Sequence, residues 1–235
     1  MANGIESSAS GAQSAIRRAQ TAADNTANSR STGFRQRRVE SRSTVGGVSD
    51  TVSLDTKDAG VKHTGQPLDL AIFGLGFFRY QQPDGGVLYS RDGALHRDDQ
   101  GLLVNTAGLP LSPEITVPDD ATAVSVTTDG RVLASGDEGA QEIGELVLAR
   151  FPNTQGLETS GDGMFRETAA SGRPIAAQPA QEGLGHVIQG YLAESNVDPI
   201  EQQVVLIEAQ ASLSANVQAI QTQDEMQRTT IDIKR

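Results

Sequence analysis

The sequence predicts an α+β protein: N- and C-terminal helices pair in a coiled-coil-like core domain, with a central antiparallel β-rich domain between them. Three observations predict this class. Small and aliphatic residues near both chain ends recur in steps of three and four, the period of helices packed along a seam. Apolar residues in the middle alternate at period two, which is typical of strands. Asp-Gly turn signals separate these alternating runs.

Residues 1–33 form the predicted N-terminal half of the helical core domain. This segment is rich in Ala, Ser, Thr, Asn and Gln, a composition typical of disorder. The expected seam residues are Ile5, Ala9, Ala12, Ile16, Ala19 and Ala23. Two Ile side chains offer little apolar surface against the conformational entropy of ordering the segment. We therefore expect it to fold only against further helices in an assembly. An intramolecular helical hairpin packed on the β domain is the alternative.

Residues 34–63 are expected to form a connecting segment, and residues 64–191 the β-rich outer domain. Within the latter, turn signals occur at residues 84–86, 92–93, 98–101 and 129–130. The alternating residues that predict strands are Leu68, Leu70 and Ile72, Phe78 and Tyr80, Ile115 and Val117, Val124 and Val126, and Leu146 and Leu148.

Residues 192–235 are predicted to form the return segment and the C-terminal helix of the core domain. Asp198 is the expected N-cap, Pro199 the first helical residue, and the helix continues to about Arg228. Its expected seam residues are Leu206, Ala209, Leu213 and Ile220. Residues 1–45 carry a net charge of +4 and residues 196–235 carry −3, so pairing of the two chain ends is electrostatically favourable.

Composition excludes several classes of function. The chain has no Cys, which excludes disulfides, thiolate nucleophiles and cysteine metal sites. The net charge of −11 argues against nucleic-acid and anionic-membrane partners. No run of about 18 apolar residues occurs, and the first residues lack a basic start followed by an apolar run. We therefore expect neither direct membrane insertion nor a cleaved signal peptide.

Chemical motifs are weak, and we expect no catalytic residue, no metal site and no cofactor. The segment Gly74–Gly76 lacks the third Gly of a dinucleotide loop, which favours a bend between strands. Three His residues have no metal-binding spacing: His63, His96 and His186. Three acidic residues occupy Asp-Gly-type turns, which favours turn chemistry over glycoside cleavage or calcium binding: Asp92, Asp98 and Asp99. An enzyme is not expected.

The only basic cluster consists of Arg35, Arg37, Arg38 and Arg42. The acidic remainder of the chain and the scarcity of aromatic residues oppose a nucleic-acid patch at this cluster. We expect these residues to form salt bridges with acidic faces of neighbouring subunits.

The stretch DNTANSRSTGFRQ resembles the signature of the flagellar rod and hook protein family. The matching residues are Asn25, Ala27, Asn28, Thr32, Gly33, Phe34 and Arg35, and Thr26 departs from the usual aliphatic residue. Residues 65–118, 151–172 and 185–202 are similar to the family as well, as is the terminal helix except at Ala211, Leu213 and Ser214. The resemblance therefore covers nearly the whole chain.

This resemblance implies a structural subunit that polymerises helically into the periplasmic drive shaft, with the distal rod favoured. Implied partners are further copies, other rod subunits, hook proteins, surrounding ring proteins and the flagellar type III export apparatus. Asn25, Asn28, Gly33 and Phe34 are expected to end the first helix and redirect the chain. The short stretch between Phe34 and Gly65 leaves a proximal-rod or hook subunit open.

Two other classes of function remain as alternatives. One is a monomeric β-rich binding module with a helical stalk. The other is an acidic hydrolase, which would need Asp92 or Asp98 for turnover.

Overall fold

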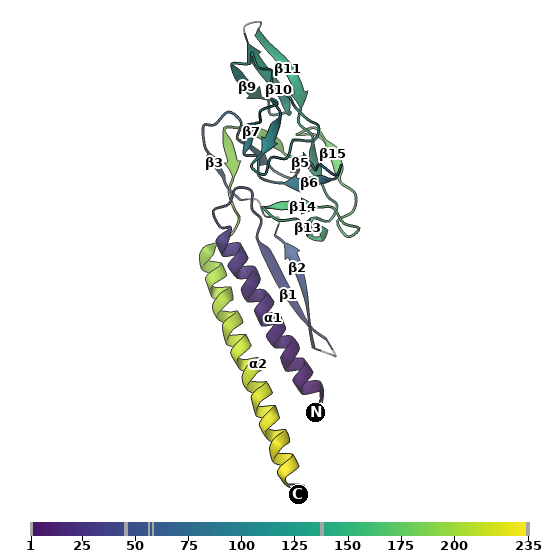
Figure 1. Cartoon of the computed structure of the whole chain (residues 1–235), viewed down its shortest axis with the longest axis vertical. Helices are drawn as coiled ribbons and strands as arrows, with labels where there is room; N and C mark the ends of the chain where they lie inside the picture. Colours follow the sequence, from purple (N-terminus) through teal and green to yellow (C-terminus); the bar gives the residue numbers. More distant parts are fainter. Residues whose placement is uncertain (1, 45–46, 56, 58, 137–138, 234–235) are drawn as a thin grey trace. The chain divides into compact units, whose positions relative to one another are not determined.

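The computed structural model describes residues 2–44, 47–55, 57, 59–136 and 139–233 (Figure 1). The chain divides into two compact units. The helical unit comprises Met1–Ser29, Gln36–Asp55 and Val197–Arg235, and the β unit comprises Arg30–Arg35 and Thr56–Asn196. Helices near the two chain ends and antiparallel strands between them confirm the predicted α+β class.

The helical unit contains two long helices and a hairpin. Helix α1 spans Ala2–Ala27 and helix α2 spans Pro199–Ile233. Strands β1 (Arg37–Thr44) and β2 (Gly47–Leu54) pair antiparallel with Val39 opposite Val52. Figure 1 shows α1 alongside both α2 and this hairpin. Contacts that order residues 1–33 are therefore present within one copy, contrary to the expectation that this segment folds only against further helices of an assembly. The hairpin lies within the predicted connecting segment, residues 34–63. It was not predicted, because β1 has a single apolar residue and shows no alternation.

The start of α2 follows the sequence prediction. The backbone N–H of Ile200 donates to Asp198 Oδ1 at 2.8 Å, so Asp198 satisfies one of the donors left open in the first turn. Pro199 is the first helical residue, where its missing N–H costs nothing. The predicted N-cap and helix start are confirmed.

The β unit is built around one antiparallel sheet of six strands, in the order β13-β14-β6-β5-β12-β15. Its strands are β5 (Phe77–Gln81), β6 (Val87–Ser90), β12 (Leu148–Arg150), β13 (Glu158–Thr159), β14 (Met164–Arg166) and β15 (Ile175–Ala177). A one-turn 3-10 helix, Thr154–Gly156, follows β12.

Smaller antiparallel sheets complete the β unit. They pair β3 (Val61–His63) with β17 (Tyr191–Ala193), β4 (Leu70–Phe73) with β16 (His186–Gln189), β7 (Leu95–Arg97) with β8 (Leu103–Asn105), and β10 (Arg131–Gly136) with both β9 (Ala123–Val126) and β11 (Gly139–Glu145).

The predicted strand through Ile115 and Val117 is wrong, and Leu146 lies between β11 and β12, outside the strand that contains Leu148. Ile115 and Val117 are 1% and 5% exposed and belong to the core, but only Thr116 forms an isolated bridge, with Leu102. Two apolar residues spaced by two can therefore fill a core from an extended loop. The fully buried Tyr80 lies at the centre of the same core, and its Oη donates to the carbonyl oxygen of Asp92 at 2.7 Å.

Candidate assembly surface of the helical unit

Helices α1 and α2 run antiparallel, and the contacts between them are spaced by multiples of seven residues on both helices. Asn25 of α1 contacts Gln202 of α2, and a β-carbon added at Gly11 would lie 2.7 Å from Asn216 Oδ1. Seven residues further, a β-carbon added at Gly4 would lie 2.6 Å from Gln223 Nε2. A seven-residue repeat on both partners is the spacing of a coiled-coil seam. Glycine on α1 lets polar side chains of α2 approach its backbone closely.

The predicted seam residues of α2 lie along this contact. Ala209 is 1% exposed, and Leu206, Leu213 and Ile220 are half-buried. They continue the heptad positions of Gln202 and Asn216 in steps of four and three.

The predicted seam of α1 is one residue out of phase with the contact inside the chain. Ile16 is 44% exposed, whereas its neighbour Ala15 is 1% exposed. Ala23 is also exposed while Ala22 is buried, and the other predicted positions, Ala9, Ala12 and Ala19, are half-buried. The Ile5 side chain lies outside the described residues. Contact of these positions with a second copy stays a prediction.

Asn25 joins three elements at the end of the seam. Its side chain is buried, with Nδ2 donating to the carbonyl oxygen of Arg37 at 2.8 Å and to Gln202 Oε1 at 2.9 Å. Its Oδ1 accepts from the backbone N–H of Arg37 at 3.0 Å. One buried amide therefore joins α1, β1 and α2, and its bond to Gln202 is buried on both sides.

A second polar contact holds α1 against the hairpin. Asp50 Oδ1 accepts from Ser14 Oγ and Ser41 Oγ, each at 2.7 Å, and its Oδ2 lies 3.4 Å from Arg17 Nε. Burial raises the pKa of Asp50, but these hydroxyls and the charges of Arg17 and Arg18 together outweigh it, so the pKa lies below its usual value. Asp50 therefore favours its charged form in the folded chain.

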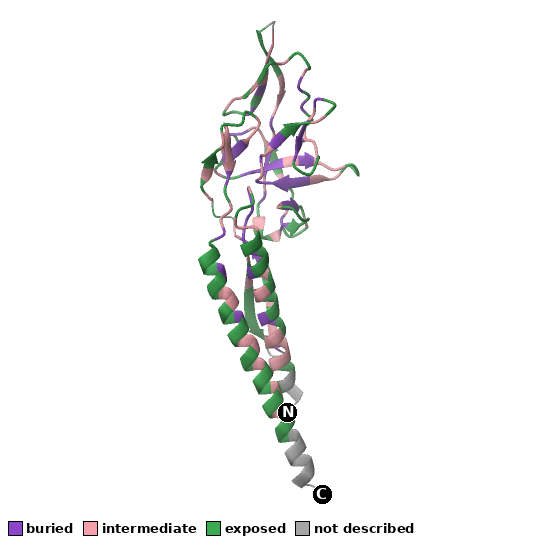
Figure 2. Ribbon diagram, turned by 60° about the vertical axis from the view of Figure 1, so that its left-hand side comes forward, coloured by how far each residue is buried: buried purple, intermediate pink, exposed green. Residues whose placement is uncertain are grey.

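A second apolar stripe of α2 lies away from α1. It consists of Ile200, Val204, Ile207 and Ala211, and we call it the outer stripe. The three larger residues are 77%, 50% and 60% exposed, in chain order. Each member precedes a seam position by two residues, which is about 200° around the helix. Figure 2 shows α2 exposed along much of its length. This stripe was not predicted from the sequence, although it repeats in the same steps of four and three.

Apolar stripes on two opposite faces distinguish α2 from an ordinary surface helix, which buries one stripe and exposes polar residues elsewhere. Contiguous exposed aliphatic residues mark an interaction surface. The outer stripe is therefore a candidate interaction surface of the helical unit. Neither described helix has a stretch long and apolar enough to cross a membrane.

Two family descriptions match the chain. Residues 71–134 match "Flagellar hook protein FlgE/F/G D1 domain", and residues 188–233 match "Flagellar basal body rod FlgEFG protein C-terminal". Flagellar basal-body rod protein FlgG of Bacillus subtilis is 34% identical over 81% of this chain and 74% of its own length. The chain belongs to the flagellar basal-body rod protein family. The family predicted from the sequence is thus confirmed.

Other rod proteins match over different lengths. FlgG of Buchnera aphidicola from Acyrthosiphon pisum is 40% identical over 67% of this chain, which spans 62% of that relative's length. FlgF of Caulobacter vibrioides is 30% identical over 89% of each chain.

The residues that follow Asn25 in the rod-family motif make contacts within the unit to which each belongs. Asn28 Nδ2 donates to the carbonyl oxygen of Asp24 at 2.9 Å, directly after α1 ends at Ala27. In the β unit, Gly33 has φ +66°, and a β-carbon there would lie 2.3 Å from the Asp92 nitrogen, so only glycine fits.

The next residues of the motif are buried in the β unit. Phe34 is 9% exposed, and Arg35 Nη1 donates to the carbonyl oxygen of Glu194 at 3.1 Å. Thr32 Oγ1 donates to Asp92 Oδ1 at 2.8 Å.

Two residues of the basic cluster form salt bridges within the chain, and contact of the cluster with neighbouring subunits stays a prediction. Arg37 pairs with Asp24 at 3.1 Å, and Arg38 pairs with Asp55 at 3.3 Å and Glu201 at 3.4 Å. The expected partners were neighbouring subunits, but acidic residues of the same chain are close enough to compete for these guanidinium groups.

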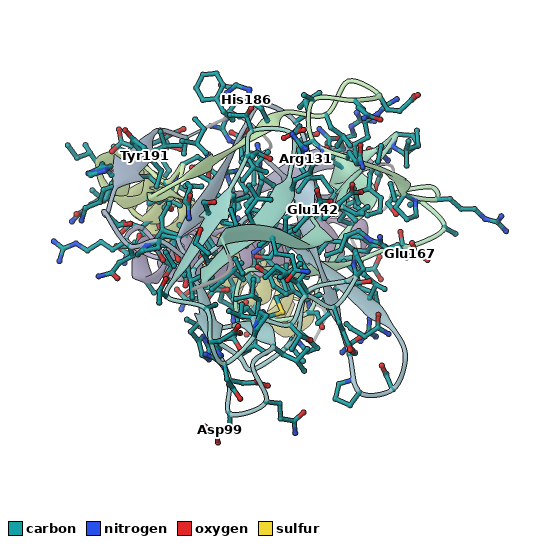
Figure 3. The ribbon with its side chains drawn as sticks, turned by 90° about the horizontal axis from the view of Figure 1, so that it is seen from above. Asp99, Arg131, Glu142, Glu167, His186 and Tyr191 are labelled. Atoms are coloured by element: carbon teal, nitrogen blue, oxygen red, sulfur yellow. The ribbon has the colours of Figure 1, made fainter. Side chains whose placement is uncertain are left out.

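Asp98 and residues 74–76 occupy a turn and a bend in this rod-family chain. Asp98 Oδ1 accepts from the backbone N–H groups of Gln100 and Leu102, as expected for a turn. Residues 74–76 form a bend between β4 and β5, as predicted. Figure 3 shows Asp99 and His186 at opposite edges of the view. In the described parts of the chain, no three His, Asp or Glu residues gather closely enough to hold a metal ion.

Proposed function

We propose that this chain is a structural, non-enzymatic subunit of the distal flagellar rod, which polymerises helically into the periplasmic drive shaft. The observation that carries the proposal is the outer stripe of α2, exposed on a chain of the rod protein family. Its proposed partners are further copies, other rod subunits, hook proteins, surrounding ring proteins and the flagellar type III export apparatus.

The mechanism is mechanical. Copies join head to tail through contacts that do not close into a ring, and such contacts generate a helical filament. The seam joins α1 to α2 within one copy, and the outer stripe packs against helices of another. Burying a large aliphatic side chain contributes about 1.5–3 kcal/mol, so Ile200, Val204 and Ile207 together supply a strong contact.

The variant Ile207→Asp tests this mechanism, because Ile207 is exposed and its loss should leave a single copy folded. We expect unchanged helix content by circular dichroism, and a critical concentration for polymerisation raised at least about tenfold. Gln210→Asp is the matched control, since it adds the same charge at an exposed polar position of α2 and should assemble normally. Leu213→Asp should lose both helix content and assembly, because Leu213 lies in the seam. Normal motility with Ile207→Asp in cells lacking the wild-type chain would contradict the mechanism.

Another position in the rod is a second candidate. The match to Caulobacter FlgF covers 89% of that protein, more than the 62% covered in Buchnera FlgG. Expression in strains lacking either FlgG or FlgF separates the two positions. Restored motility only in the strain lacking FlgG supports the distal rod, and restoration only in the strain lacking FlgF refutes it.

A further inference from the structure

The β unit contains a small cavity with cationic and aromatic walls. Its volume is about 220 Å³, and its walls include Arg35, Arg91, Arg150, Leu75, Phe77 and Phe151. All six belong to the β unit. Pockets for drug-sized ligands and cofactors are usually larger, at about 300–1,000 Å³. The cavity therefore suits one amino-acid side chain better than a cofactor.

Arg150 carries the argument for an anionic occupant. Its Nε is buried and has no hydrogen-bond partner, and this residue forms no ion pair within the described chain. A buried N–H without an acceptor is costly, more so on a charged group. Arg150 lines the cavity, so a carboxylate bound there would neutralise its guanidinium charge.

The two other guanidinium groups are held rigidly. Arg91 Nη2 donates to the carbonyl oxygen of Gly74 at 2.7 Å, and Arg91 Cζ lies 5.8 Å from the centre of the Phe77 ring. Arg35 donates to the carbonyl oxygens of Phe34 and Glu194. Both side chains are 4% exposed. Fixed guanidinium groups favour carboxylates because little entropy is lost when the pair forms.

The rest of the cavity favours a protein partner. The rings of Phe77 and Phe151 pack edge to face with centres 6.0 Å apart. Leu75 is 60% exposed, and Phe73, two residues earlier, is 58% exposed. Aromatic and Arg residues together are the composition of the energetic centres of protein interfaces.

We propose that this cavity receives the carboxylate side chain of an exposed acidic turn of a second copy of the chain. The proposal rests on the proposed function, since it assumes that copies polymerise. The β unit has nineteen Asp and Glu residues against eleven Lys and Arg residues, so copies mainly present carboxylates to one another. Like-charged copies need a local cationic site to associate. Figure 3 shows Asp99 on such a turn, at the edge of the β unit. A pocket on one copy and a turn on the next form a head-to-tail contact that does not close.

The first test compares Arg150→Gln with Arg173→Gln in the full chain. Arg173 is an exposed Arg of the same unit outside the cavity, so it controls for the loss of charge. We expect Arg150→Gln to raise the critical concentration for polymerisation at least about tenfold and Arg173→Gln to change it less than about twofold. Thermal unfolding checks that both variants are folded. Equal critical concentrations for both variants, with both folded, would overturn the proposal.

A soluble probe tests the cavity without polymerisation. Sodium benzoate combines a carboxylate with an apolar ring, and its binding to the monomer is measured by calorimetry. We expect binding to the wild-type chain, and at least about tenfold weaker binding to Arg150→Gln. Arg150-dependent benzoate binding by a chain that does not polymerise would refute the proposed function but leave the carboxylate site standing. No benzoate binding to the wild-type chain would refute the site itself.

Cross-linking identifies the occupant. Because the chain has no Cys, Leu75→Cys gives a single attachment point for a photoactivated cross-linker at the mouth of the cavity. In polymers and in isolated basal bodies, we expect the cross-linked peptide to come from a second copy and to contain Asp or Glu. A cross-link to a different protein in basal bodies, or to a peptide without acidic residues, would overturn the assignment.

Discussion

Replacing Asn25 with Ala tests whether one buried amide holds the helical unit together. The substitution removes three hydrogen bonds of 2.8, 2.9 and 3.0 Å, and leaves both backbone groups of Arg37 and the Gln202 oxygen without this partner. A net contribution of about 0.5–1.5 kcal/mol per hydrogen bond gives an expected loss of about 3 kcal/mol in the free energy of unfolding. This is a large share of the 5–15 kcal/mol typical of a domain.

Urea unfolding followed by far-ultraviolet circular dichroism is the suitable assay, because both long helices belong to the helical unit. The concentration must keep the chain monomeric, since assembly would add stability. Gln20→Ala is the control, as Gln20 is exposed on α1 and should change the free energy of unfolding by less than about 0.5 kcal/mol. A loss below about 0.5 kcal/mol for Asn25→Ala would refute the reasoning.

Two further predictions concern single buried groups. The lowered pKa of Asp50 stabilises the folded chain above the unperturbed value of 3.8, and this contribution is lost as pH falls through the folded-state pKa. Asp50→Asn should therefore destabilise the helical unit at pH 6 and much less at pH 3, as measured by urea unfolding; an equal loss at both values would contradict this. Tyr80→Phe removes the hydrogen bond to the Asp92 carbonyl and should lower the free energy of unfolding of the β unit by about 1–2 kcal/mol, followed by near-ultraviolet circular dichroism; no loss would show that the carbonyl finds another donor.

Helix α2 could be predicted well because its signals are local. Asp198 and Pro199 mark the start by side-chain chemistry, and Leu206 and Leu213 are large enough to reveal the phase of the seam. The outer stripe repeats in the same steps of three and four. It was not predicted, because the seam residues alone account for this periodicity.

The buried face of helix α1 could not be predicted in the same way. The face of α1 that was expected to be buried is the one that carries the large aliphatic residue Ile16. The structure instead buries Ala15 and places Gly11 against Asn216. In a helix of small residues the partner sets the buried face, and the strongest hydrophobic signal does not mark it. The hairpin beside α1 was missed for a related reason, because its strands are mostly polar.

The cavity of the β unit could not be predicted from the spacing of residues in the sequence. Arg35, Arg91 and Arg150 come from separate parts of the chain and meet only when the β unit folds. The motif around Arg35 matches the family signature, whereas no motif in the sequence includes Arg150.

Electron cryomicroscopy of filaments grown from the purified chain tests the central claim, that helices of neighbouring copies pack along the outer stripe of α2. The account predicts that Ile200, Val204 and Ile207 of each copy are covered by a helix of another copy. Filaments joined only through β units, with this stripe facing solvent, would contradict it.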